Sequence, residues 1–434
     1  MRENNGGVPA LSRPPAGTSA AQPARNPSSL VGRVGHRFGF WIIALAFAIG
    51  MAFSTVPTPL YPLYQARDGF STLMITAIFA VYAVGVIISL LLAGHVSDWW
   101  GRKSILIPAL GLELLAAALF VTVPSLSGLI VARLVTGLGV GMLTATATAH
   151  LHELHTRHRP GATGFRFEAV STAANIGGLG VGSLVAGLLA QYVDGPLRTP
   201  YLVFAGLLLL SILGVVLTPE TVEEPLVRRT YRPQRISIGH GDRAAYVAAA
   251  AAGFASFAVF GVFTSVAPGF VAATLHHPSR ALAGLMVFSV FAPAAATQAL
   301  TSRMRPGDKL ASGLAAQALG LVLLTVGMHA INLPAFLVGG AITGIGAGML
   351  FKSAVGAVAT MAAPARRSEA LAGLFLISYL GLSVPAVGIG VLTTRHVTPT
   401  AAVTWLAIML LIILGAVAAL SRRRPAGAPS ASSQ

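Results

Sequence analysis

The sequence contains no cysteine among its 434 residues, and only 10% of its residues are charged. The first absence excludes a disulfide framework and thiol chemistry. The second excludes an ordinary soluble domain, in which roughly 25% of residues carry a charge. Because 55% of the residues are hydrophobic and the mean hydropathy is +0.76, we expect the chain to fold inside a lipid bilayer.

Acidic residues are scarce as well: 13 aspartates and glutamates stand against 29 lysines and arginines, which gives a net charge of +16. Such a balance can indicate nucleic-acid binding, but here the basic residues stand at the ends of apolar segments and do not alternate with aromatic residues. The sequence also lacks the pattern Gly-x-x-x-x-Gly-Lys-Ser/Thr, which excludes ATP hydrolysis by a nucleotide-binding loop. We therefore expect no nucleic-acid partner and no cofactor.

Twelve apolar runs separate the charged clusters. Crossing a hydrocarbon core of about 30 Å takes roughly 20 apolar residues in a helix. Within the lipid, a single segment can satisfy its backbone N–H and C=O groups only as a helix. The sequence therefore predicts an all-α polytopic membrane protein with twelve transmembrane helices. The runs cover residues 38–63, 72–93, 104–123, 127–149, 167–193, 200–218, 244–274, 282–301, 310–329, 333–361, 370–393 and 400–420.

The basic residues indicate the orientation. Of the 29, four lie on the side opposite the N-terminus and two lie inside the runs, so 23 share the side of the N-terminus. Since lysine and arginine are enriched in cytoplasmic loops, both termini are expected in the cytoplasm, and the protein in the plasma (inner) membrane. The exceptions are Arg67, Arg198, Arg280 and Arg395 on the opposite side, and Arg133 and Lys352 inside the runs.

A repeat divides the chain into two halves. Residues 134–143 read LVTGLGVGML and residues 341–350 read AITGIGAGML, 207 positions later. Both lie on predicted helices of the same direction, the fourth and the tenth. We expect six-helix bundles over 38–218 and 244–420, a cytoplasmic linker over 219–243, and tails over 1–37 and 421–434, the first of them disordered and without a signal peptide. The repeated glycines allow close helix packing: Gly137, Gly141, Gly344 and Gly348.

The loop between the second and third predicted helices carries a motif. It reads Gly94-His-Val-Ser-Asp98-Trp-Trp-Gly101-Arg102-Lys103. This resembles the signature loop of the major facilitator superfamily, and the resemblance covers residues 38–420. It implies that Asp98 acts as a conformational latch against the eleventh helix in the outward-facing state. The alternative is a basic loop in which Asp98 is only solvated.

Two ionisable residues inside the membrane are candidates for proton coupling. Arg133, followed by Gly137, Gly139 and Gly141, resembles the family's second motif, whose arginine is associated with proton coupling or charge pairing. The alternative is that Arg133 extends to the membrane surface. Glu113 lies in the middle of the third predicted helix, where an ionisable group is a functional candidate by default. The alternative is a structural hydrogen bond or a pair with Arg133.

The fifth predicted helix keeps only part of an antiporter pattern. Family antiporters often have Gly-x-x-x-Gly-Pro here, and this chain has Gly178 and Gly182 followed by Ser183. The glycines still predict close helix packing, but the proline of the antiport signature is missing.

Other polar residues are candidates for the cavity or for its cytoplasmic end. Lys352 either extends outward to the cytoplasmic membrane surface or lines the cavity as a cation that serves an anionic substrate or proton coupling. Glu168 and Glu369 complement helix dipoles, or pair with Arg102 or Lys103 as a gate. The histidine-rich run 150–158 is interpreted as a basic loop with no metal site. The cavity and substrate candidates are Tyr61, Asn175, Gln298, Lys352 and Tyr379.

These features predict a monomeric secondary active transporter of a small molecule that works by alternating access. Proton-coupled efflux of drugs or metabolites is the first hypothesis, and a proton-coupled importer of a sugar or other metabolite is the second. A membrane-embedded enzyme would need paired carboxylates, a nucleophile with its base, or a metal cluster, and the sequence shows none of these constellations. The expected partners are the substrate, protons and the lipid bilayer.

Overall fold

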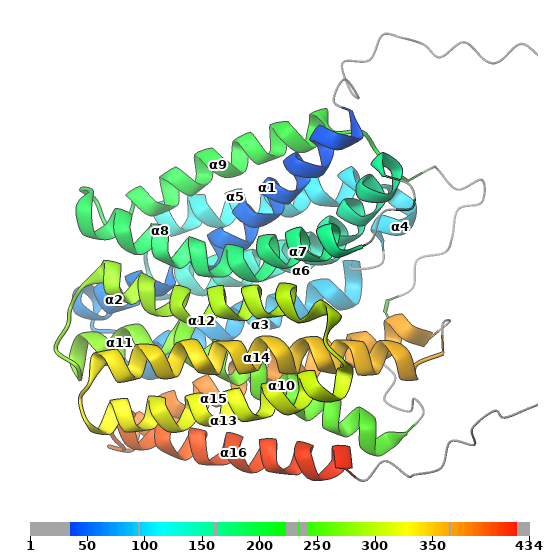
Figure 1. The fold of residues 1–434 in the computed structure, drawn as a ribbon. Coiled ribbons are helices and arrows are strands. Elements are labelled where there is room, and N and C mark those ends of the chain that lie inside the picture. The colour runs from blue at the N-terminus through cyan, green and yellow to red at the C-terminus, as the bar shows by residue number, and fades with distance from the viewer. Residues whose placement is uncertain are drawn as a thin grey trace, which may run out of the picture.

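A computed structural model describes residues 35–93, 96–159, 161, 164–222, 233–234, 242–363 and 366–422. Across these residues the chain forms helices and turns without a strand, and twelve helical segments are long and apolar enough to cross a membrane. Figure 1 shows them running side by side along one direction. The all-α fold with twelve candidate spans is as predicted.

In the described residues, the first six spans and the loops between them contain nine α-helices, one 3₁₀ turn and one π-helical segment, because two spans are interrupted and one short helix lies in a loop. They are α1 (His36–Thr55), the 3₁₀ turn η1 (Thr58–Leu60), α2 (Tyr61–Asp68), α3 (Thr72–Ala93), α4 (Ser97–Trp100), α5 (Lys103–Thr122), α6 (Leu126–His158), α7 (Phe165–Thr172), the π-helical segment η2 (Ala173–Gly177), α8 (Gly178–Tyr192) and α9 (Thr199–Leu217).

The last six spans follow the same scheme. They comprise α10 (Arg243–Ser265), α11 (Ala267–Ala273), α12 (Arg280–Leu300) with the 3₁₀ turn η3 (Thr301–Arg303), α13 (Pro306–His329), α14 (Leu333–Met361), α15 (Arg367–Thr394) and α16 (Pro399–Arg422). The prolines at 57, 59 and 62 explain the break between α1 and α2, because each removes a backbone donor. By contrast, α15 continues through Pro385.

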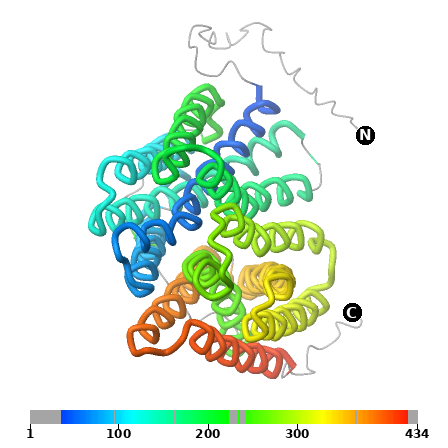
Figure 2. The backbone as a smooth tube through the Cα atoms, turned by 90° about the vertical axis from the view of Figure 1, so that its left-hand side faces the viewer, coloured from blue at the N-terminus to red at the C-terminus, as the bar shows by residue number. Residues whose placement is uncertain are grey.

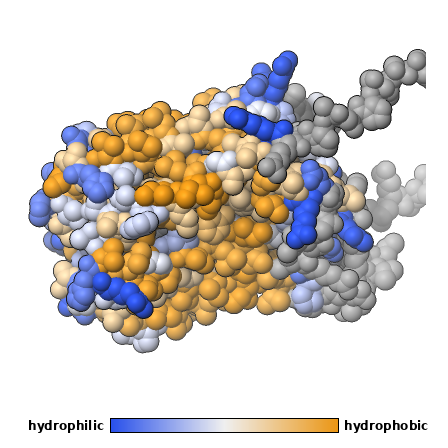
Figure 3. Space-filling model, turned by 90° about the horizontal axis from the view of Figure 1, so that it is seen from below, coloured by the Kyte–Doolittle hydropathy of each residue, from blue (hydrophilic) through white to orange (hydrophobic). Residues whose placement is uncertain are grey.

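The exterior is apolar where the spans cross. Figure 3 shows a hydrophobic band around the middle of the visible face and hydrophilic residues toward the ends. Large apolar side chains point outward, among them Leu210 at 64%, Trp405 at 67% and Ile412 at 68% exposure. In water such a surface would aggregate, whereas in lipid it is solvated.

The helices form two groups, visible in Figure 2 as a blue-to-green set and a green-to-red set. Between the groups, α3 packs on α15 and α8 packs on α12. Within them, the repeated glycines have equivalent positions. A side chain at Gly137 or Gly141 of α6 would collide with α3, and one at Gly344 or Gly348 of α14 would collide with α12. Because α3 and α12 are the second spans of their groups, the repeated sequence makes the same helix contact in both groups.

Glycine also brings α8 against α1. A Cβ atom at Gly178 would lie 2.8 Å from the carbonyl oxygen of Ala48, and one at Gly182 would collide with the carbonyl of Ala52. These glycines therefore have the packing position expected from the sequence.

The bundle has two ends. The terminal face is the end at which the described chain begins and ends, Gly35 and Arg422, at the right of Figure 1. The opposite face carries α2 and α11. On the opposite face the two groups touch: the Arg280 backbone N–H donates to Gln191 Oε1 at 3.0 Å, and its Nη1 donates to the Ala190 carbonyl at 2.9 Å.

One predicted boundary was wrong by a large margin. The interpretation of residues 150–158 as a loop is corrected, since α6 continues to His158 and His150 is fully buried. The apolar run ends near residue 149, but the helix extends beyond it with polar residues.

Candidate functional site

A cavity of about 90 Å³ lies between the two groups of helices. Its two walls differ. The wall from α1, η1, α3, α6 and η2 is largely polar, with Ser54, Thr55, Thr58, Tyr82, Arg133, Thr144 and Asn175. The wall from α10, α12, α14 and α15 is largely aromatic, with Phe257, Phe260, Phe291, Phe351, Phe375 and Tyr379. Of the predicted substrate contacts, Asn175 and Tyr379 therefore line this cavity.

Arg133 projects from α6 into the polar wall and is only 1% exposed. Its Nη1 donates to the carbonyl oxygen of Ser54 at 2.6 Å, and the guanidinium lies 4.7 Å from the ring centre of Tyr82. Its Nε has no hydrogen-bond partner among the described residues. The alternative that Arg133 extends to the membrane surface is thus wrong.

Glu113 lies on α5 behind this wall and is completely buried. Its Oε1 is 3.1 Å from where a Cβ atom of Gly139 would stand, so the glycine of α6 makes room for the carboxyl group. Neither carboxyl oxygen has a hydrogen-bond partner among the described residues. The alternative in which Glu113 pairs with Arg133 or makes a structural hydrogen bond is therefore corrected.

Asn175 reaches the cavity from the π-helical segment η2. A π-helical turn adds one residue to an α-helix and changes which side chains face a neighbour, and such turns are frequent at functional sites. Apart from the small residues around it, no pattern in the sequence indicates this turn.

Three other candidates lie outside the lining. Tyr61 is 2% exposed and its hydroxyl has no partner among the described residues. Gln298 and Lys352 lie toward the terminal face, where Lys352 Nζ donates to the Gln298 carbonyl at 2.6 Å and is 3.4 Å from Glu168 Oε2. Lys352 therefore does not simply extend to the membrane surface: its ion pair joins α14 to α7 across the two groups.

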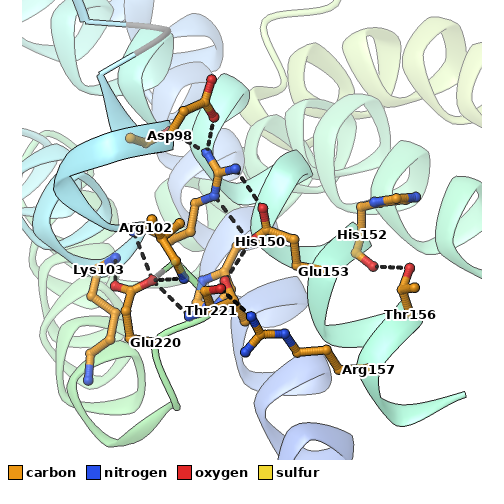
Figure 4. Close-up of polar contacts among 12 residues, drawn as sticks. Asp98, Arg102, Lys103, His150, His152, Glu153, Thr156, Arg157, Glu220 and Thr221 are labelled. Atoms are coloured by element: carbon orange, nitrogen blue, oxygen red, sulfur yellow. Dashed lines mark hydrogen bonds and ion pairs between the residues drawn. The ribbon is translucent and has the colours of Figure 1, made fainter. Parts of the chain in front are cut away.

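The motif loop forms a charged network at the terminal face (Figure 4). Arg102 Nη1 donates to Asp98 Oδ1 at 2.6 Å, and its Nη2 and Nε donate to the two carboxyl oxygens of Glu153 at 2.6 and 3.2 Å. Asp98 thus pairs within its own group of helices, and its side chain is 62% exposed. Among the described residues Asp98 makes no bond to α15, so the latch expected for an outward-facing state is not seen in this part of the chain, and Gly94 lies outside it.

The same loop donates hydrogen bonds to Glu220, which follows α9. Its Oε1 accepts from the backbone N–H of Arg102 at 3.0 Å and its Oε2 from that of Lys103 at 2.9 Å. These N–H groups begin α5 and have no partners inside that helix. Loss of water around Glu220 would by itself raise the pKa of its carboxyl group. The backbone donors, those of Lys103 and Val222 first, outweigh it and hold that pKa below its usual range.

Sequence reasoning missed Glu153 and Glu220 as parts of this network. The available signal was that they are acids within strongly basic segments of the same predicted face. The predicted gate was also assigned the wrong partner: Glu168 pairs with Lys352, while Arg102 pairs with Asp98 and Glu153.

Replacing Glu220 with glutamine is expected to lower the free energy of unfolding by about 1 kcal/mol near neutral pH. A buried hydrogen bond to a charged group contributes about 1.5–3 kcal/mol, and exposure to water weakens this one. Because the folded-state pKa of Glu220 is lowered, the contribution is complete above the unfolded value of about 4.3 and is lost as pH falls through the folded value. Thermal unfolding of both proteins across pH measures this. A difference that persists unchanged at about pH 3 contradicts the assignment.

Comparisons with known proteins agree with this architecture. The family model of the Major Facilitator Superfamily matches residues 9–126 and 41–326. The puromycin resistance protein pur8 of Streptomyces alboniger is 32% identical over 202 residues, which cover 46% of this chain and 38% of that protein. An uncharacterized MFS-type transporter of Mycobacterium tuberculosis is 31% identical over 149 residues, 33% of this chain and 25% of that protein. The chain thus matches less than half the length of these relatives.

Solved structures share the fold at low sequence identity. The human organic anion transporter MFSD10 superimposes with a TM-score of 0.64 at 17% identity, covering 89% of this chain and 100% of that one. A POT family transporter in complex with 5-aminolevulinic acid gives a TM-score of 0.69 at 12% identity, covering 91% and 99%. With the family model spanning most of the twelve helices, this chain belongs to the Major Facilitator Superfamily and is a membrane transporter that resembles its drug efflux members.

Proposed function

We propose that this protein exports small amphipathic molecules across the plasma membrane by alternating access, driven by protons. The observation that carries the proposal is a cavity between two six-helix groups with contacts between the groups on either side of it. On the opposite face Arg280 bonds to Gln191, and toward the terminal face Lys352 pairs with Glu168. Alternating access requires contacts of this kind to break in turn.

The export direction is supported by the relative named for puromycin resistance, since lowering the internal concentration of a drug is one way to resist it. The mixed polar and aromatic lining of the cavity suits an amphipathic molecule. Import remains the second candidate, favoured by Ser183, which stands where family antiporters often have proline.

Proton coupling is supported by the two buried ionisable groups. Glu113 and Arg133 lie on neighbouring helices, and the buried carboxyl oxygens of Glu113 have no hydrogen-bond partner among the described residues. A buried carboxylate without a partner is costly, and taking up a proton removes that cost. Arg133 lines the cavity, so a change of charge at Glu113 acts on a group that faces the substrate.

The test is uptake of two radiolabelled amphipathic molecules, the amine puromycin and the anion dansyl sulfonate, into everted membrane vesicles with an acidic interior. Export by proton exchange predicts accumulation that collapses when an ionophore dissipates the pH gradient. Empty vesicles, made from cells without the protein, give the background. Accumulation that is indifferent to the gradient contradicts the proton coupling. Gradient-driven accumulation only in vesicles of native orientation contradicts the direction and favours import.

A further inference from the structure

Among the described residues that line the cavity, one is a cation and none is an acid. Arg133 is the single charged side chain among the described residues that line it. A guanidinium group has five N–H donors, yet Arg133 makes one hydrogen bond, to the carbonyl of Ser54, and its Nε has no partner within the described chain. The ring centres of Tyr82 and Phe79 lie 4.7 and 5.6 Å from the guanidinium carbon, but rings accept no conventional hydrogen bond, so the described chain leaves donors of this buried cation without an acceptor.

Glu113 does not fill this role. Its carboxyl group lies behind α6, against Gly139, and it is not among the residues that line the cavity. It affects Arg133 only through the electric field, so no carboxylate of the described chain occupies the hydrogen-bonding positions of the guanidinium. A cationic ligand would meet an unpaired positive charge here, whereas an anionic ligand would complete the pair.

The facing wall is a continuous set of aromatic rings. Phe257 is central: its ring centre lies 4.8 Å from that of Phe351 and 5.4 Å from that of Tyr379. Next to it, Phe260 stacks on Phe291 at 4.6 Å. Such rings bind a flat apolar group by stacking and edge contacts. They also attract cations, but the unpaired guanidinium across the same narrow cavity repels them.

We propose that the cavity selects molecules that join a flat aromatic group to an anionic, oxygen-rich group such as a carboxylate or sulfonate. Arg133 binds the anion with its free N–H groups and determines the specificity, while the wall around Phe257 and Phe351 holds the aromatic part. This inference rests on the proposed function, because it takes the cavity to be the place where the transported molecule binds.

The test uses three fluorescent probes with the same aromatic ring and different charge: dansyl sulfonate, dansyl amide and dansyl cadaverine. Their binding to the purified full chain in lipid nanodiscs is measured by fluorescence titration. We expect the sulfonate to bind about tenfold or more tighter than the other two, since a hydrogen bond to a charged partner has that weight. Arg133→Gln should remove the preference, and Phe351→Ala should weaken all three probes.

Two further variants keep the result interpretable. Arg133→Lys retains the charge but loses the planar fork, so the sulfonate preference should fall while remaining above onefold. Arg67→Gln removes one positive charge from the opposite face, where Arg67 bonds to Asp68, and should leave the preference unchanged. Thermal unfolding establishes that each variant is folded. If Arg133→Gln does not fold, Arg133→Lys decides: an unchanged preference overturns the role of Arg133.

The outcomes separate this inference from the proposed function. Equal binding of the three probes, or tighter binding of the cation, overturns the inference even if gradient-driven export of puromycin is observed. Failure of all three probes to bind overturns it as well. A sulfonate preference that depends on Arg133 supports it, and then the absence of any gradient-driven flux contradicts the proposed function alone.

Discussion

Glu113→Gln should abolish accumulation driven by a pH gradient while leaving downhill flux intact. Exchange of one proton across a gradient of about two pH units can drive up to roughly 100-fold accumulation, because each unit is equivalent to a factor of ten. Glutamine has nearly the shape of glutamic acid, so the pocket against Gly139 is retained. Only the ability to exchange a proton is lost, and accumulation should fall to about onefold.

Uptake into everted vesicles measures both parts of this result, with and without an imposed gradient. Glu369→Gln is the matched control: it removes an acid from the first turn of α15, where Glu369 forms no ion pair within the described chain. Arg133→Ala should also lose gradient-driven flux, because Arg133 lines the cavity and is the group on which a change of charge at Glu113 acts. If Glu113→Gln and Arg133→Ala both accumulate substrate like the unmodified protein, proton coupling lies elsewhere.

The fold was predictable because its determinants are local. Each span is a run of apolar residues, and the bilayer leaves an isolated segment no alternative to a helix. The paired glycines were predictable for the same reason, since Gly137 and Gly344 mark close approach wherever the neighbouring helix is. The identity of that neighbour, α3 in one half and α12 in the other, needed the structure.

The site was less predictable because it depends on contacts between distant segments. Glu168 and Lys352 are 184 positions apart, and nothing local to either residue identifies the other. Asn175 faces the cavity through a π-helical turn, which the 3.6-residue period of an ideal helix does not anticipate. Glu153 was missed because the apolar run stops before the end of α6. The last turns of this helix are stabilised by packing against the protein and lie beyond the apolar stretch that marks the span.

Reversing one charge of the Glu168–Lys352 pair is expected to open the cavity toward the terminal face. In Glu168→Lys a favourable pair is lost and two cations oppose each other across the groups. With about 1 kcal/mol for each effect at a partly exposed site, the equilibrium should shift roughly 30-fold. The double variant Glu168→Lys with Lys352→Glu restores opposite charges and should return most of the shift, although the bond from Lys352 to the Gln298 carbonyl is lost.

The absence of cysteine makes this measurable with a single reporter. Ser54→Cys places a thiol in the cavity at a position that is 2% exposed in this structure, so its reaction with a membrane-impermeant maleimide should be slow. In everted vesicles Glu168→Lys should raise that rate by about the same 30-fold. Glu369→Lys makes the same charge change in the first turn of α15 and should not. If Glu168→Lys and Glu369→Lys have equal effects, net surface charge is responsible and the pair is not a gate. If the double variant stays as reactive as Glu168→Lys, the opposite charges at positions 168 and 352 do not hold the two groups together, because the Lys352–Gln298 hydrogen bond that the double variant also lacks lies within the second group.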